Sequence, residues 1–141
     1  MRDWRELVPP DEDARGKFFA HLLRKTCTRQ QAKEYLSCMK FPESLLNEAE
    51  DAGLVDDLAY ARLFADGHAS WGNAKISHEL AMRGVSRENV RLALDEIADE
   101  ADRAREIAEG LRRSGLEERK IRARLMSRGF SGRSVSEAVR E

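Results

Sequence analysis

Apolar residues recur at helical spacing along most of this chain, and one stretch of the pattern occurs twice. Residues 76–94 align without a gap with residues 121–139, at an offset of 45 residues. In both copies, two apolar residues four positions apart precede an Arg-Gly pair, and further apolar residues follow. A repeat of this period indicates one supersecondary unit that is used several times. The aligned pairs include Ile76 with Ile121, Leu80 with Leu125, and Val90 with Val135.

Each copy predicts a helix, a glycine turn and a second helix. Gly84 and Gly129 follow the last helical turn, where a left-handed cap favours glycine, and we interpret both as structural turns. Ser86 and Ser131 then offer a side-chain oxygen to cap the next helix. Replacing Gly84 with valine is therefore expected to destabilise the protein by about 1 kcal/mol or more.

A more degraded copy of the unit precedes these two. Thr28 and Gln31 have the spacing of a capping box, and the helix that they begin has an inner face that includes Leu36 and Met39. Lys40 stands where the later copies have glycine, so this turn is expected to differ in form or to carry strain.

The helices that flank this first copy also have apolar faces. An earlier helix is expected over residues 14–25, since Pro9-Pro10 opposes a helix before it. A short third helix follows Phe41-Pro42 and ends at Gly53. Its apolar side is Leu45, Leu46 and Ala49, and the side chains of the earlier helix that are expected to face the core are Phe18, Phe19, Leu22 and Leu23.

The sequence thus predicts an all-α protein built from tandem three-helix, helix-turn-helix-like repeats. The expected divisions are an N-terminal tail over residues 1–12 and three-helix units over residues 13–53, 54–98 and 99–141. The join between the last two units has an apolar heptad pattern without Gly or Pro. Either one long helix spans residues 87–113, or the chain bends near Glu100.

Composition narrows the class of protein. Charged residues make up 36% of the 141 residues and aromatic residues 6%, and no apolar run approaches the roughly 20 residues of a membrane-spanning helix. Cys27 and Cys38 form neither a disulfide framework nor a metal motif, which favours a reducing, cytoplasmic setting. The net charge of −1 is the sum of +3 over residues 1–40, −8 over residues 41–100 and +4 over the rest. This asymmetry indicates different surfaces for different partners, or attraction between the ends and the middle.

No constellation of an enzyme is found. His21, His68 and His78 lack metal-ligand spacing, and neither cysteine has the context of a nucleophile. Gly110 and Gly115 are not followed by the Lys-Ser/Thr of a phosphate loop. We therefore expect no catalytic residue, no cofactor and no metal.

A basic cluster within 22 residues is the strongest candidate for binding. Arginine suits bidentate contacts with phosphates and carboxylates, so a polyanion or an acidic protein is one expected partner. The alternative is an ordinary solvated helix face. The cluster consists of Arg112, Arg113, Arg119, Lys120, Arg122, Arg124, Arg128 and Arg133.

A helix-turn-helix with glycine in its turn is also a DNA-binding device, and residues 76–94 and 121–139 both allow that interpretation. In the middle unit, however, Glu88, Asp95 and Glu96 oppose affinity for phosphates. The last unit is electrostatically better suited to it. A helical-repeat adaptor for an unrelated partner is the third alternative.

Taken together, these residues resemble the RecX family, which regulates the RecA recombinase. The similarity covers nearly everything after residue 13 and rests on the order of its motifs rather than on any one of them. It includes Arg29, Leu36, Phe41-Pro42-Glu43, Leu54-Val55-Asp56-Asp57, Tyr60-Ala61, Lys75-Ile76, Glu79-Leu80, Arg83-Gly84-Val85, Leu125 and Arg128-Gly129-Phe130-Ser131.

The resemblance implies an extended, curved array of three-helix units that binds in the groove of the RecA–single-stranded-DNA filament. It implies a non-enzymatic monomer that inhibits the recombinase, ATPase and coprotease activities of RecA in DNA repair and the SOS response. Weak binding to single- or double-stranded DNA is a further expectation.

The chain departs from the family where basic residues are usual in the middle unit, because it has His68, Ser70, Trp71 and Asn73 there. Contacts are expected to lie partly in the basic cluster of the last unit. The candidates in the middle unit are Arg62, Lys75, Arg83 and Arg87.

Overall fold

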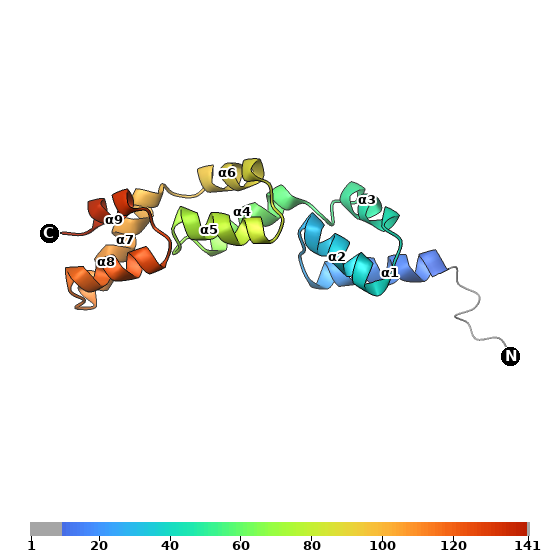
Figure 1. Cartoon of the computed structure of the whole chain (residues 1–141), viewed down its shortest axis with the longest axis horizontal. Helices are drawn as coiled ribbons and strands as arrows, with labels where there is room; N and C mark the ends of the chain where they lie inside the picture. Colours follow the sequence, from blue (N-terminus) through green and yellow to red (C-terminus); the bar gives the residue numbers. More distant parts are fainter. Residues whose placement is uncertain (1–9, 141) are drawn as a thin grey trace. The chain divides into compact units, whose positions relative to one another are not determined.

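The structure is a computed structural model, and it describes residues 10–140. Over this range the chain is all-α, with helices and turns but no strand (Figure 1). The predicted all-α class is therefore confirmed. The helices are α1 (Pro10–Arg24), α2 (Arg29–Met39), α3 (Ser44–Asp51), α4 (Asp57–Gly67), α5 (Asn73–Met82), α6 (Arg87–Asp95), α7 (Glu100–Arg113), α8 (Glu118–Ser127) and α9 (Gly132–Ala138).

The chain folds into two compact units. In the described range, the first contains residues up to Tyr60 together with the turn Arg83–Val85. The second contains Ala61–Met82 and the residues from Ser86 onward. We refer below to α1–α3, α4–α6 and α7–α9 as the first, middle and last triplets. The division into three independent units remains a prediction.

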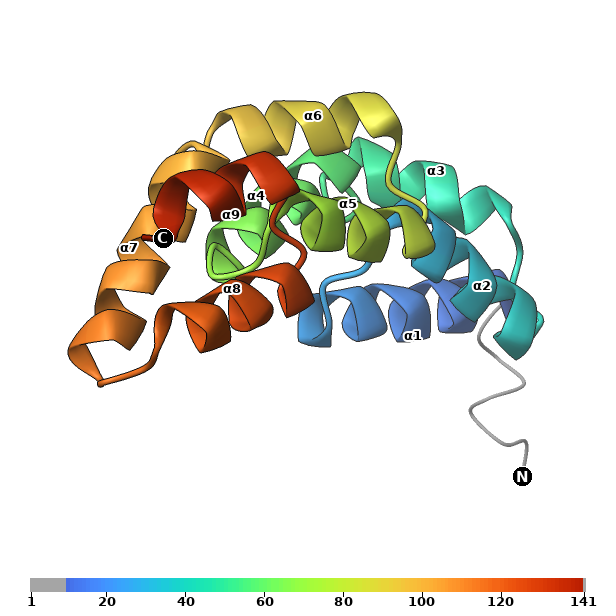
Figure 2. The same cartoon turned by 60° about the vertical axis from the view of Figure 1, so that its left-hand side comes forward.

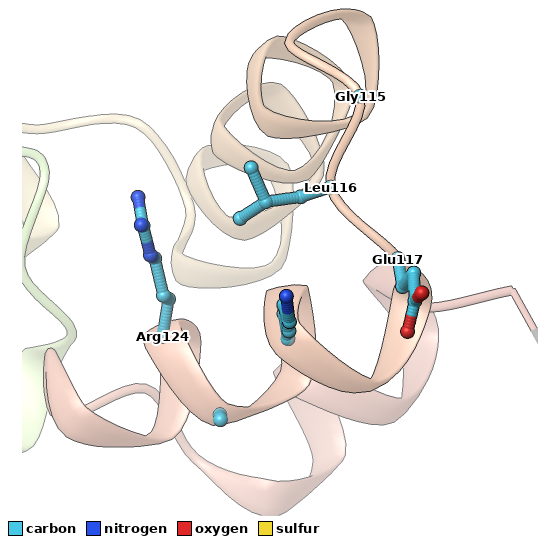
Figure 3. Close-up of a pocket in the computed structure, with 6 residues that line it drawn as sticks. Gly115, Leu116, Glu117 and Arg124 are labelled. Carbon is cyan, nitrogen blue, oxygen red and sulfur yellow. The ribbon is translucent and has the colours of Figure 1, made fainter.

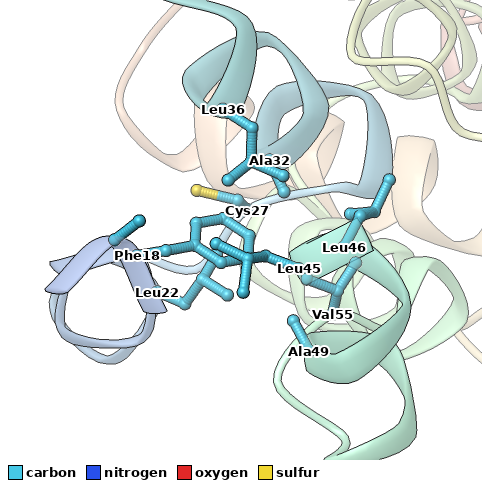
Figure 4. Close-up of a cluster of buried hydrophobic side chains, with 10 residues drawn as sticks. Phe18, Leu22, Cys27, Ala32, Leu36, Leu45, Leu46, Ala49 and Val55 are labelled. Atoms are coloured by element: carbon cyan, nitrogen blue, oxygen red, sulfur yellow. The ribbon is translucent and has the colours of Figure 1, made fainter. Parts of the chain in front are cut away.

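The core of the first unit consists of side chains of α1 that lie four residues apart and of side chains on the inner faces of α2 and α3 (Figure 4). Phe18 and Leu36 are fully buried, as are Leu45 and Leu46. The prediction that Leu23 and Met39 face the core was wrong, since Leu23 is 74% exposed and Met39 is 44% exposed. The buried positions of α1 are Ala14, Phe18 and Leu22, which leave Leu23 on another face.

The second unit has its own buried side chains. In the last triplet, α7, α8 and α9 all pack on one another (Figure 2). Ile121, Leu125 and Val135 are fully buried there, beside Ala104 and Ala108 of α7. In the middle triplet, α5 buries Ile76 and Leu80, the residues that align with Ile121 and Leu125.

The first helix begins earlier than predicted. It starts at Pro10, whereas proline was expected to exclude a helix there. A proline in the first turn is compatible with the helix, because the N–H that it lacks would have no intrahelical partner at that position. Of the predicted tail over residues 1–12, residues 1–9 lie outside the described range.

Residues 87–113 form two helices rather than one. The first, α6, ends at Asp95, and the second, α7, begins at Glu100. Asp99 has a non-helical backbone and caps α7 by accepting a hydrogen bond from the N–H of Ala101. The bend near Glu100, rather than the continuous helix, is therefore the correct alternative.

The predicted caps are present in all three triplets. Thr28 and Gln31 form a reciprocal capping box, and Ser86 and Ser131 each accept from the backbone N–H three residues later. Gly84 and Gly129 both have φ of +88°. Lys40 has φ of 58°, so it adopts the left-handed region without being glycine.

Candidate interaction surface

The first turn of α2 is held by two hydrogen bonds from segments far along the chain. The Thr28 hydroxyl donates to the carbonyl oxygen of Arg83 over 2.6 Å. The N–H of Arg29 donates to Oδ1 of Asp57 over 2.7 Å. The α5–α6 turn and the first residue of α4 therefore both meet the N-terminus of α2, and all of these residues belong to the first compact unit.

The first turn of α5 is held in the same way within the second unit. The N–H of Gly72 donates to the carbonyl oxygen of Arg128 over 2.8 Å, and the N–H of Asn73 donates to Oε2 of Glu100 over 2.7 Å. Arg128 aligns with Arg83 in the sequence repeat, and Glu100 begins α7 as Asp57 begins α4. We call each such set of contacts a joint.

Each joint brings a glycine turn into close contact with the preceding triplet. A Cβ atom on Gly129 would lie 2.6 Å from Cβ and 2.8 Å from the backbone nitrogen of Lys75. One on Gly72 would overlap the backbone of Gly129 and Phe130, and one on Gly84 would overlap the side chain of Gln30. The glycines therefore make room for the joints as well as for positive φ.

The Glu100 carboxylate is the centre of the second joint. Besides Asn73, it accepts from the N–H of Ser131 over 3.1 Å and from the hydroxyl of Ser134 over 2.8 Å, both through Oε1. Burial opposes its ionisation, but the hydrogen bonds from Ser131, Asn73 and Ser134 outweigh burial and lower the pKa of Glu100 below its ordinary value.

Arg103 completes this joint from one turn further along α7. Its side chain is buried, and its guanidinium donates to the carbonyl oxygens of Ala98 and Trp71 over 2.8 and 2.5 Å, and to the side-chain oxygen of Asn73. Sequence reasoning missed this role. No motif distinguishes Arg103 from the other arginines of α7, since most of its partners lie in the distant segment that contains Trp71 and Asn73.

The candidate contact residues of the middle triplet have different environments. Arg62 of α4 pairs with Glu96 over 2.8 Å. Lys75 of α5 lies over the ring of Trp71, 4.3 Å from its centroid. Arg83 gives its carbonyl oxygen to the first joint, and Arg87 is exposed at the start of α6.

Aromatic side chains cluster between α4 and α5, the segment in which RecX proteins usually have basic residues. The rings of Phe64 and His68 stack with centroids 4.1 Å apart, and His68 lies 4.3 Å from Trp71. His68 Nδ1 is 2.8 Å from the carbonyl oxygen of Phe64. With Lys75 on the same indole, these side chains pack the α4–α5 turn on itself.

Two arginines of the predicted basic cluster form ion pairs within the last triplet. Arg112 binds Glu118 and Glu109, each over 2.7 Å, and only 19% of its side chain is exposed. These pairs raise its pKa, and the bond from Arg112 lowers the pKa of Glu118. Arg133 pairs with Glu137 over 3.4 Å but remains 89% exposed.

Most of the basic cluster lies on or beside α8. Arg122 and Arg128 are half-buried, and Arg128 provides the carbonyl oxygen of the second joint. Four other members are exposed and have no ion pair with any residue in the range 10–140, which leaves their charge available to a partner. They are Arg113, Arg119, Lys120 and Arg124.

A pocket of about 400 Å³ lies beside the first turns of α8 (Figure 3). Leu116 forms its apolar wall, and Lys120 and Arg124 line it one helical turn apart. Arg124 and Glu117 lie toward opposite ends of the view in Figure 3. The remaining lining residues are Gly115 and Ala123.

None of the helices between residues 10 and 140 has the length and apolar character needed to cross a membrane. The same residues include no group of three or more His, Cys, Asp or Glu side chains placed to hold a metal ion.

Comparisons with known proteins agree with the geometry of repeated triplets. Residues 56–94 match the family model described as "RecX, second three-helix domain". The regulatory protein RecX of Thermobifida fusca is 30% identical over 135 residues, which cover 85% of this chain and 73% of that protein. The chain belongs to the RecX family. The RecX protein of Caldanaerobacter subterraneus subsp. tengcongensis is 27% identical over 91% of the chain and 70% of its own length.

Solved RecX structures have the same fold. One crystal structure of a regulatory protein RecX matches 92% of this chain with a TM-score of 0.74 and 23% identity, and the chain covers 72% of that structure. RecX from Lactobacillus salivarius matches 90% of the chain with a TM-score of 0.73 and 21% identity, and 95% of that structure is covered. The predicted helical-repeat fold of the RecX family is thus confirmed.

Proposed function

We propose that this chain regulates RecA by binding along the RecA–single-stranded-DNA filament and limiting the activities of RecA there. The observation that carries the proposal is membership of the RecX family, whose relatives are named regulatory proteins. The names of these relatives state only that they are regulatory proteins. The binding mode, the inhibition and the cellular role in DNA repair and the SOS response are parts of our proposal.

Two physical features support the proposal. The protein repeats one three-helix module, and its last triplet has exposed cationic side chains without ion pairs in the described range. A filament offers the same surface many times, so weak contacts from successive triplets add through effective concentration. Exposed arginine and lysine without internal partners suit acidic surfaces and phosphates. The proposed contacts are Arg113, Arg119, Lys120 and Arg124, with Arg87 of the middle triplet as a further one.

Direct reading of DNA by a helix-turn-helix receives less support. Its second helix in the last triplet would be α9, which has seven residues. Ser134, Val135 and Ala138 of α9 are buried, and Arg133 is paired with Glu137. Few side chains of α9 are left to contact base edges. We therefore treat binding to bare DNA as an outcome of the test.

The test is co-sedimentation with RecA filaments assembled on single-stranded DNA with a non-hydrolysable nucleotide, beside bare DNA and free RecA. We expect the chain to pellet with filaments only, and its addition to lower the RecA ATPase rate. A variant with Arg113, Arg119, Lys120 and Arg124 changed to Glu is expected to lose both effects.

The matched control changes four exposed cations of the first triplet, Lys17, Arg24, Lys25 and Lys33, to Glu. It has the same net charge as the test variant, so it separates a local contact from general electrostatics. If both variants lost filament binding equally, the last triplet would not be the contact site. Equal pelleting with bare DNA would favour the DNA-binding alternative, and no pelleting with filaments would refute the proposed function.

A further inference from the structure

Three helices of this chain begin at equivalent positions of the repeat. The N-termini of two of them are covered by a joint, and the N-terminus of the third is not. The helices α2, α5 and α8 begin at Arg29, Asn73 and Glu118, which are 44 and 45 residues apart. The first two N-termini each receive a carboxylate, from Asp57 and Glu100. Each also has a glycine turn packed against it.

At α8, a pocket takes the place of the joint. Glu117, in the N-cap position, makes no capping hydrogen bond through its side chain. The pocket of about 400 Å³ is bordered by the first two turns of α8 and by Leu116. Lys120 and Arg124 line it without any ion pair inside the described part of the chain (Figure 3). The start of α8 thus combines an N-terminus without a side-chain cap, two free cations and an apolar wall, and Glu117 is the one acidic residue that lines the pocket.

We propose that this pocket binds an acidic segment of a partner protein, with a partner carboxylate in the position that Asp57 and Glu100 occupy in the two joints. Lys120 and Arg124 neutralise that segment, and Leu116 packs against an apolar residue beside it. The inference goes beyond the proposed function, because it states which chemical groups the pocket binds and does not require the partner protein to be RecA.

A carboxylate fits the site better than a phosphate of nucleic acid. In both filled joints, the group that meets the helix N-terminus is a protein carboxylate, 2.7 Å from the first N–H. Leu116 and Ala123 also give the pocket an apolar part, which suits a side chain next to the acid and leaves a sugar-phosphate backbone without a partner.

A second copy of this chain fits the pocket poorly. The only turn of the described chain that aligns with Gly84 and Gly129 and is not already part of a joint contains Lys40. Its side chain would add a third cation beside Lys120 and Arg124. Its Cβ would also occupy the space that the joints leave for glycine.

The test measures binding of a fluorescein-labelled, end-blocked acidic octapeptide, Glu-Leu-Gly-Glu-Asp-Gly-Leu-Glu, by fluorescence anisotropy with the full chain. The pocket variant is K120E with R124E, and the matched control is R113E with R119E, which makes the same charge change on exposed residues outside the pocket. We expect the pocket variant to weaken binding about tenfold or more, because two charge-assisted contacts are lost, and the control to change it only a few-fold.

Chemical-shift mapping on the unmodified chain keeps the test independent of how the variants fold. The peptide is expected to shift the amide signals of Leu116, Lys120, Ala123 and Arg124. Equal weakening in both variants, equal binding of a Gln/Asn version of the peptide, or shifts confined to residues outside the pocket would each overturn the proposal. So would tighter binding of an oligothymidylate that displaces the peptide, since it would make the site a phosphate site. None of these outcomes depends on RecA.

Discussion

The turn at Lys40 and the turn at Gly129 have the same place in the repeat and similar backbones. Lys40 has φ of 58° and Gly129 has φ of +88°, so both lie in the left-handed region. Each follows the second helix of its triplet. They differ in their surroundings, since Lys40 is exposed whereas a Cβ on Gly129 would meet Lys75.

The comparison separates two reasons for glycine. A left-handed residue other than glycine costs roughly 1–2 kcal/mol, which a protein tolerates at a single turn. Overlap with a neighbouring backbone cannot be relieved by changing a rotamer. Glycine is therefore favoured by the backbone at all three turns, and packing adds a second reason in the joints, against the backbone of Lys75 at Gly129 and against the side chain of Gln30 at Gly84.

The largest effect is expected for Gly72→Ala. The new methyl group would overlap the backbone of Gly129 and Phe130, and neither can move without breaking the joint. We expect a loss of about 3 kcal/mol or more in the free energy of unfolding, measured by urea denaturation. The control is Gly110→Ala in α7, where no atom lies within 4 Å, and it should stabilise the protein by up to about 1 kcal/mol. A small effect of Gly72→Ala would show that the second joint is not tightly packed.

Glu100→Gln is expected to cost about 2 kcal/mol at neutral pH, because an amide nitrogen would face hydrogen-bond donors that the carboxylate now accepts from. Since folding lowers the pKa of Glu100, the unfolded chain binds the proton more readily. The stabilisation is present above the ordinary pKa of 4.5 and is lost as the pH falls through the lowered value.

The measurement for Glu100 is the stability of both proteins by urea denaturation between neutral pH and pH values below 4.5. The difference between them should shrink on acidification. Glu106→Gln, an exposed change on the same helix, should leave the stability nearly unchanged throughout. A difference that stays constant with pH would mean that the ionised carboxylate does not hold the joint.

Gly84→Ala tests the first joint, where the obstacle is a side chain rather than a backbone. We expect a cost of about 1–2 kcal/mol from positive φ and from the overlap with Gln30. Gln30→Ala in the same protein should recover part of this cost, and a double-mutant cycle measures that part. Without any recovery, the cost would come from the backbone conformation alone.

The smallest effect is expected for Lys40→Gly, and its sign is opposite. Glycine removes the strain of the left-handed turn and meets no joint there, so stability should rise by about 1 kcal/mol at most, since glycine also favours the unfolded chain. Thermal unfolding followed by circular dichroism measures the change. Destabilisation would show that the Lys40 side chain makes a contact worth more than the strain.

The joints could be predicted only in part from the sequence. The spacing of Gly84 and Gly129 predicted their turns, and Ser86 and Ser131 were recognised as caps because capping depends on residues three positions apart. Asp57 belongs to a motif of the family resemblance, but nothing in the sequence indicated that it caps α2, a helix whose first residue lies 28 positions earlier. Contacts between residues about 30 positions apart leave no periodic signal, which is why Glu100 and Arg103 were missed.

The candidate surface shows the same limit. The basic cluster around α8 was evident from the count of arginines, but their availability was not. Arg112 is held by Glu109 and Glu118, whereas Lys120 and Arg124 line a pocket. Which charges are neutralised depends on the packing of α7 against α8, because that packing brings Glu118 of α8 to Arg112 of α7.

By itself, the sequence determined the helices, their caps, the repeat and the family, since all of these follow from local spacing and from the order of short motifs. Tertiary structure decided where the chain bends before Glu100, which face of α1 is buried, and how one triplet meets the next. The physical reason is that a helix can form from its own neighbours in sequence. A joint needs a carboxylate and a glycine turn from distant segments to fit around one helix N-terminus, and the second joint also needs the buried guanidinium of Arg103.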